Sequence, residues 1–242
     1  MIKCIRIVLL VFSAIVLFSS CEKNADSNQL SNEEVIAGLK EALNVATDTS
    51  VSILNKQDGY FKDALVKIFL PPEAQVIYSN LAKVPGGQKL LDDVVLSINR
   101  SAEMAAKQAT PIFISAISSM TIQDGFQILN GADTAATNYL RQKTYMSLFD
   151  AFKPPVQSVL SKPVVLGMSA VQTYKNLLDA YNLASLGGLL FEQVKTNTLS
   201  NYVTDKALNG LFLKVSLQEQ KIRKDPIQQV TDLLKKVFGG QK

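Results

Sequence analysis

The chain has 242 residues, of which 47% are hydrophobic and 19% are charged, and its formal net charge is +4. This apolar fraction excludes a largely disordered chain and fits one domain, or at most two. A net charge this small gives no support to a nucleic-acid partner, which would show as a clustered basic face.

The first twenty residues have the layout of a secretory signal peptide. Lys3 and Arg6 precede an apolar run from residue 7 to residue 18, which is too short to span a bilayer. The segment ends in "LFSSC", which resembles a bacterial lipobox and implies cleavage before Cys21 and diacylglyceryl attachment to its sulfur. The alternative is an ordinary signal peptide with a chance cysteine at that place.

The expected mature chain begins at Cys21 and holds no other cysteine, so it can form no internal disulfide. Residues 21–30 are polar and aperiodic, which predicts a flexible tether, and residues 31–240 are expected to form a single helical domain. We therefore expect a lipid-anchored protein of the bacterial cell envelope, on the periplasmic face or in the outer membrane.

Helical periodicity dominates the sequence from Ser31 onward. Ser31 is a plausible N-cap, and Glu34 three residues later completes a capping box for the first helix. Asp58-Gly59 predicts a turn, and the apolar piece "ALVKIFL" after it fits either one helical turn or a short extended segment. The piece ends at Pro71-Pro72, where another helix is expected to begin.

Most of the remaining chain also predicts helices, separated by proline and glycine. They are expected at residues 72–84, 88–109, 110–120, 122–129, 135–148, 199–225 and 226–239, with two more between residues 147 and 184. Thr110 is expected to cap one of them, with Pro111 at its first position, and Pro154-Pro155 to interrupt another. No run alternates as a strand would, so the expected fold class is all-α, an irregular multi-helix bundle of roughly eight to ten helices.

The polar stretch "TIQDGFQILNGADTAATNYLRQKT" is explained mainly by helix ends. Thr121, with Asp124 three residues later, predicts the start of one helix. Asn130-Gly131 is expected to supply the left-handed residue that ends this helix, and Asp133 or Thr134 is expected to cap the next one.

Three polar clusters hold the candidate ligand-binding residues. They are Asn130, Asp133 and Arg141 in that stretch, Asn99, Arg100 and Glu103 on an earlier helix, and Tyr202 and Lys206 on a later one, in a row with Asn209. Arg100 and Glu103 can pair on one helix face. Asn99 lies close to the apolar face of the same helix, where its amide would be buried and hydrogen-bonded. Tyr202 and Lys206 can transfer a proton if the lysine is buried enough to lose its charge. The structural alternatives are a solvated face, a surface ion pair and a lysine stem over an aromatic ring.

The absence of histidine excludes histidine-assisted serine or cysteine catalysis and the usual zinc sites. The sequence has no glycine-rich phosphate loop, and its patterns identify no carboxylate pair at hydrolase spacing. No cofactor and no metal site are expected, and any catalysis would use carboxylate, lysine, tyrosine or arginine side chains.

Five stretches, in order, together resemble one family of bacterial exported proteins, known as the domain of unknown function 4197. They are "EEVIAGLKEAL", "LSINRSAEMAAKQATPIF", "MTIQDGFQILNGADTAATNYLR", "NYVTDKALNGLFLKV" and "KIRKDP" followed by "TDLLKKVFG". The resemblance implies a compact helical domain that is exported or lipid-anchored, and it implies no activity. It also implies more acids than this chain has in "NGADTAAT" and "LQEQKIR", so a cation site built on those acids would be weak here.

We expect a non-enzymatic envelope lipoprotein whose helical domain binds a partner or an amphipathic ligand. Such a domain would keep an apolar cavity or patch after core packing, and the residues of "VVLGMSAVQTY" are candidates to line it. One alternative is an envelope enzyme, which requires Tyr202, Lys206, and Arg141 or an acid to converge in one cleft. Another is an assembly factor or scaffold, marked by a large exposed apolar patch.

Overall fold

The computed structural model describes most of the chain between residues 31 and 225. The described residues are 31–75, 79, 83, 85–165, 167–190, 193, 198–225, 235 and 237. The expected signal peptide and tether lie outside them, as do nearly all of the expected final helix and most of the helix expected at residues 72–84. Of the latter, a short 3₁₀ turn, η1 (Pro72–Ala74), is described.

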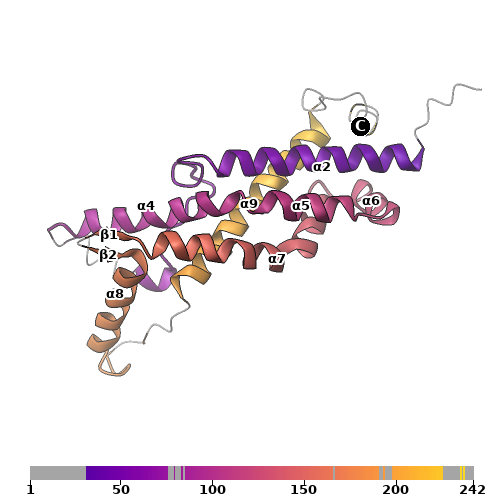
Figure 1. Cartoon of the computed structure of the whole chain (residues 1–242). Helices are drawn as coiled ribbons and strands as arrows, with labels where there is room; N and C mark the ends of the chain where they lie inside the picture. The colour runs from indigo at the N-terminus through magenta and orange to yellow at the C-terminus, as the bar shows by residue number, and fades with distance from the viewer. Residues whose placement is uncertain are drawn as a thin grey trace, which may run out of the picture. The chain divides into compact units, whose positions relative to one another are not determined.

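Seven α-helices make up most of the described part, so the all-α prediction is confirmed, with fewer helices than expected. They are α2 (Asn32–Leu54), α4 (Gly87–Ala106), α5 (Ala109–Ser118), α6 (Ile122–Leu129), α7 (Ala135–Leu160), α8 (Ala170–Ala184) and α9 (Leu199–Lys224) (Figure 1). The sequence does not predict the two-stranded antiparallel hairpin of β1 (Pro163–Val165) and β2 (Met168–Ser169). These strands are too short to show alternation, and Gly167, with a φ of +77°, lies between them.

The long helices bury their apolar faces against one another. α7 lies against α4 and α5, α2 packs on α5 and α6, and α9 crosses them with contacts to α2, α4 and α7 (Figure 1). One side of α9 is an apolar stripe that is buried at each position: Leu199, Val203, Ala207, Gly210 and Leu211. Among the described helices, none alone is long and apolar enough to cross a membrane, and α5 with α6 meets that test only as a pair bent by 105°.

The junction between α4 and α5 differs from the prediction. Lys107 and Gln108 keep a right-handed helical backbone, so α5 begins at Ala109 without an extended N-cap residue. Thr110 therefore lies inside the helix and does not cap it. Pro111 still falls in the first turn, where its missing N–H leaves no intrahelical hydrogen bond unmade.

Helix α7 continues through Pro154-Pro155, where the sequence predicts an interruption. A proline inside a helix costs about 3 kcal/mol. A fully buried i, i+4 row runs past the prolines: Leu148, Phe152, Val156 and Leu160. Burial of each such side chain stabilises by about 1.5–3 kcal/mol, so the packing of the row outweighs the local cost.

Residues 55–71 form an irregular loop between α2 and η1, named here the α2–η1 loop. The piece "ALVKIFL" within it begins as a turn and continues without regular secondary structure. Its side chains alternate between core and solvent, as in an extended segment. The buried ones are Val66, Ile68 and Leu70, and the well-exposed large apolar ones are Leu65 and Phe69.

Candidate functional site

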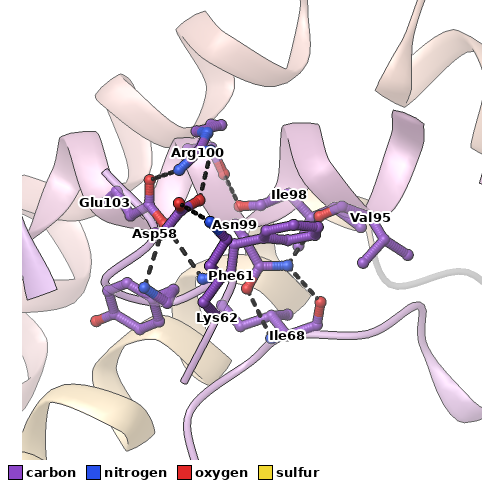
Figure 2. Close-up of polar contacts among 11 residues, drawn as sticks. Asp58, Phe61, Lys62, Ile68, Val95, Ile98, Asn99, Arg100 and Glu103 are labelled. Atoms are coloured by element: carbon purple, nitrogen blue, oxygen red, sulfur yellow. Dashed lines mark hydrogen bonds and ion pairs between the residues drawn. The ribbon is translucent and has the colours of Figure 1, made fainter. Parts of the chain in front are cut away.

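Asn99 on α4 holds the α2–η1 loop by its side-chain amide (Figure 2). Its Oδ1 accepts a hydrogen bond from the backbone N–H of Ile68 at 2.9 Å, and its Nδ2 donates to the Ile68 carbonyl at 2.8 Å. The same Nδ2 donates to the carbonyl of Val95 at 2.8 Å. Asn99 and Ile68 are both buried, so the amide replaces the partner that a neighbouring strand would provide. Asn99 is thus the buried amide that the sequence suggested.

Glu103, one turn further along α4, holds the start of the same loop (Figure 2). Its Oε1 accepts from the backbone N–H groups of Tyr60 and Phe61, each at 3.2 Å. Its Oε2 accepts from Arg100 at 2.6 Å, which is the pairing predicted from their spacing. A buried carboxylate with these partners fixes the loop backbone against α4.

Asp58 closes this network from the loop side (Figure 2). Arg100 donates to it at 2.7 Å, and Lys62 pairs with it at 2.9 Å. Hydrogen bonds from Lys62 and then Arg100 hold the pKa of the Asp58 carboxyl below its usual range. The next residue, Gly59, packs on the end of α2, where a Cβ would lie 2.5 Å from the Ile53 carbonyl oxygen.

The loop fixed in this way forms one wall of a surface groove of about 320 Å³, named here the α9 groove. The wall from the loop consists of Leu65, Val66, Lys67, Ile68 and Phe69, and the wall from α9 consists of Tyr202, Lys206, Asn209, Gly210 and Leu213. Gly210 lets the walls approach, because a Cβ there would lie 3.0 Å from the ring of Tyr60 and 3.2 Å from Val66. Tyr60 donates from its hydroxyl to the Ala207 carbonyl at 2.8 Å.

The groove combines exposed apolar surface with positive charge. Leu65, Phe69 and Leu213 are exposed large apolar residues. Among the described residues of the lining, Lys67 and Lys206 are the charged ones, and none is a carboxylate. Such a surface can bind an apolar group and an anionic group side by side.

Both lysines lie over aromatic rings. The Nζ of Lys67 is 4.4 Å from the ring centroid of Phe61 and 5.4 Å from that of Phe69. The Nζ of Lys206 is 5.5 Å from the ring centroid of Tyr202, as the structural alternative for this pair expects. These contacts orient the aliphatic part of each lysine side chain. The ammonium groups can still donate hydrogen bonds to an anionic partner.

Arg141, on α7, reaches the groove through Asn209. It donates to Asn209 Oδ1, and Asn209 Nδ2 donates to Asp205 at 3.0 Å. Asp205 also accepts from the hydroxyl of Tyr145. The guanidinium lies 5.1 Å from the ring centroid of Phe212. Arg141 therefore fixes the position of the groove residue Asn209, and its guanidinium is already bonded to that side chain.

The pKa of the Tyr145 phenol makes this network sensitive to high pH. Burial, and then the hydrogen bond to Asp205, raise the pKa of Tyr145 to about 12 from an ordinary value of 10.0. Because the folded-state pKa is the higher one, the neutral phenol stabilises the fold below pH 10, and this contribution is lost as the pH rises through about 12. We expect ultraviolet titration of phenolate to lose one tyrosine that ionises near pH 12 in Tyr145→Phe, while the fully buried Tyr60, whose pKa burial also raises, stays late-ionising. An unchanged titration curve in that variant would contradict the assignment.

Glu219 caps α7 from a different helix. Thr134, one of the two predicted alternatives, is the N-cap residue of α7, but its side chain makes no capping hydrogen bond. Glu219 on α9 instead accepts from the backbone N–H groups of Ala136 at 3.0 Å and Thr137 at 2.8 Å. A buried carboxylate satisfies these unpaired N–H groups and the helix dipole together.

Arg223 joins the same cap to α6. It pairs with Glu219 at 3.0 Å and donates to the carbonyl of Ile128, near the end of α6, at 2.9 Å. The two charged side chains are 8% and 5% exposed, so neither charge is screened by water. One ion pair on α9 therefore fixes both the end of α6 and the beginning of α7.

Asn130 and Asp133 lie at this helix junction and line none of the hollows described here. Asn130 ends α6 with a right-handed backbone, and Gly131 has no positive φ, so the prediction of a left-handed terminator is wrong. Gly131 is needed for space, because a Cβ there would lie 2.6 Å from that of Ala135. Asp133 pairs with Lys224 at the surface.

A second hollow, of about 570 Å³, lies between α5 and α7 and is larger than the α9 groove. Its charged groups are Asp124 and Lys143. Asp124 completes the predicted capping box with Thr121, whose hydrogen bonds lower the pKa of the carboxyl, and Lys143 lies over the ring of Tyr139. Its charges balance, so it offers less to a charged ligand than the α9 groove. No three potential metal-ligating side chains gather anywhere in the described residues.

Comparison with known proteins assigns the chain to a family whose activity is not known. A family model described as "Protein of unknown function (DUF4197)" matches residues 29–239. No curated protein and no solved structure matches the chain. The matched range includes both walls of the α9 groove and the helix junction at Glu219.

Proposed function

The chain belongs to the DUF4197 family, a family of unknown function, and we propose that it is a non-enzymatic cell-envelope domain that binds an anionic amphipathic molecule in the α9 groove. The observation that supports this proposal is the lining of the groove. It joins exposed apolar side chains to two lysines without any carboxylate. A molecule with an acyl-like chain and a negatively charged head matches both parts.

The apolar part of the groove explains why the ligand carries a chain. Phe69 and Leu65, on the loop, and Leu213, on α9, expose apolar surface across a short gap. Covering such surface is worth roughly 25 cal/mol for each Å² removed from water. A purely ionic ligand would leave this surface wet and gain nothing from it.

The charged part explains why the head is anionic. Lys67 and Lys206 come from opposite walls and give the groove its positive charge, which attracts a negatively charged group. The nearby carboxylates of Asp63 and Asp205 are already engaged, with Lys214 and with Tyr145. Hydrogen bonds to charged groups contribute about 1.5–3 kcal/mol, which is enough to set the preference for an anion.

The walls are held in place before any ligand arrives. Asn99 and Glu103 bind the backbone of the α2–η1 loop, and Tyr60 ties the loop to α9. A groove whose walls are fixed in this way does not lose loop entropy when it is filled. The polar cluster on α4, weighed as a ligand site from sequence, thus serves the groove by positioning its wall.

The enzyme alternative lacks a supporting observation. Tyr202 and Lys206 do line one groove, but the Lys206 side chain is exposed to solvent. Proton transfer by a tyrosine–lysine pair requires a lysine that burial has made less basic. Arg141 is held by Asn209 and does not line the groove. The described residues of "VVLGMSAVQTY" do not line the groove either.

The test uses dansyl undecanoic acid, an anionic fluorescent amphiphile, and its methyl ester. We expect Lys67→Gln/Lys206→Gln to weaken binding of the acid roughly tenfold, equivalent to about 1.4 kcal/mol, and to leave binding of the ester unchanged. The matched control is Lys56→Gln/Lys107→Gln, which removes the same charge at two exposed positions outside the groove. Equal affinity of both double variants for the acid would refute the proposal.

A further inference from the structure

The segment after α8 exposes apolar side chains at four of eight positions. Residues 183–190, "LASLGGLL", are named here the leucine tip. Leu183 is 79% exposed, Leu186 64%, Leu189 82% and Leu190 64%. Single exposed leucines are ordinary, but four in one short uncharged segment mark a surface that meets an apolar partner.

The tip is a defined turn with its backbone bonded internally. The N–H groups of Gly188 and Leu190 both donate to the Ser185 carbonyl, at 3.2 Å and 3.1 Å. Those of Ser185 and Leu186 donate to carbonyls of the last turn of α8, at 3.1 Å each. Gly187 has a φ of +73° and Gly188 of +93°, which lets the chain fold back sharply. Four N–H groups of the turn are therefore already bonded within the chain, which lowers the cost of placing it at the edge of a lipid layer.

Charge is nearly absent from α8 and the tip. Between residues 168 and 190 the charged side chains are Lys175 and Asp179, and these two pair with each other at 2.5 Å. The tip itself also lacks tryptophan, tyrosine and arginine, the residues that dominate the energetics of protein interfaces. Leucines without polar anchors suit a fluid hydrocarbon layer better than a specific protein surface.

The chain that precedes the described domain keeps it near a membrane. The apolar run of residues 7–18 favours a bilayer in the uncleaved chain, and the lipid expected on Cys21 favours it in the mature one. Residues 22–30 are nine in number and span at most roughly 30 Å when fully extended. The domain that begins at Asn32 therefore stays within about its own dimensions of the bilayer surface. α8 packs against α4, α9 and the hairpin, and the tip lies at its C-terminal end with all four leucines exposed (Figure 1).

We propose that the leucine tip inserts into the lipid bilayer as a second contact, independent of the N-terminal anchor. Its occupant is the acyl region of a membrane, which Leu183, Leu186, Leu189 and Leu190 enter together. This inference concerns a different surface from the α9 groove, so it stands or fails separately from the proposed function.

The experiment places a nitroxide label on the full-length chain in vesicles of phosphatidylethanolamine and phosphatidylglycerol. In a Cys4→Ser/Cys21→Ser background, the label is attached to Leu189→Cys in the tip. The matched control is Met146→Cys on α7, which is 68% exposed and lies outside the tip. Neither side chain is part of the core, so the label displaces no packing.

We expect the tip label to be reached by oxygen, which concentrates in lipid, and to be shielded from a water-soluble nickel reagent. The label at residue 146 should show the reverse. Equal access of the nickel reagent to both labels would overturn the proposal. Shielding from nickel without raised oxygen access would also overturn it, because that result means burial against protein.

Discussion

Replacing Glu219 by alanine is expected to lower the free energy of unfolding by about 3–5 kcal/mol, the range for breaking a buried ion pair on one side. The change leaves the Arg223 charge buried at 8% exposure and leaves the N–H groups of Ala136 and Thr137 without their acceptor. Urea denaturation followed by far-ultraviolet circular dichroism measures the loss.

The matched control for this variant is Asp133→Ala. Its ion pair with Lys224 also joins the start of α7 to the end of α9, but the two side chains are 49% and 64% exposed. Exposed pairs contribute about 0–1 kcal/mol, so this change should be nearly silent. Similar losses in the two variants would mean that burial does not determine the strength of this junction.

Replacing Asn99 by alanine is expected to cost about 2–4 kcal/mol and to reduce binding in the α9 groove. The change leaves both the N–H and the carbonyl of Ile68 unpaired in a site where that residue is 3% exposed. Each unsatisfied buried group costs about 1–3 kcal/mol. The loop wall then loses its fixed position, so dansyl undecanoic acid should bind more weakly even to the folded fraction.

Asn138→Ala supplies the comparison, because it makes the same chemical change at an exposed position on α7. Stability and binding should both stay close to those of the unchanged chain. If Asn99→Ala lowers stability but leaves the affinity for the acid unchanged, the loop wall does not shape the groove. That outcome would separate the fold argument from the binding argument.

Much of the fold can be predicted from helical spacing because the apolar faces are local patterns. The stripe on α9 and the capping box of Thr121 and Asp124 depend on residues within a few turns of one another. The row of Tyr202, Lys206 and Asn209 is likewise a local pattern, and it does form one wall of the groove. Periodicity shows which residues share a helix face, but it does not show which other element packs against that face.

The other wall depends on contacts that sequence spacing does not reveal. Asn99 meets Ile68 across 31 residues, and Tyr60 meets Ala207 across 147. One local signal was available in "ALVKIFL", where Leu65, Lys67 and Phe69 alternate with buried residues. Strict alternation favours an extended segment with one wet face, which is the face that lines the groove.

Two of the differences between prediction and structure have the same cause. Asp133 and Thr134 have the composition of a cap, but a carboxylate from α9 occupies the position where a cap would act. Pro154-Pro155 has the composition of a break, but a buried row holds the helix together. In each case a tertiary contact outweighs a preference of about 1–3 kcal/mol.

The capping of α7 by Glu219 also constrains how the chain folds. The residues it joins are 82 and 83 positions apart, so α7 has no cap until α9 packs against it. Until α9 is complete, the start of α7 and the end of α6 lack the partners that hold them, and loop-closure entropy opposes their docking. The finished arrangement therefore forms late and cooperatively, and a chain cut short before residue 219 loses the junction of three helices as well as the end of one.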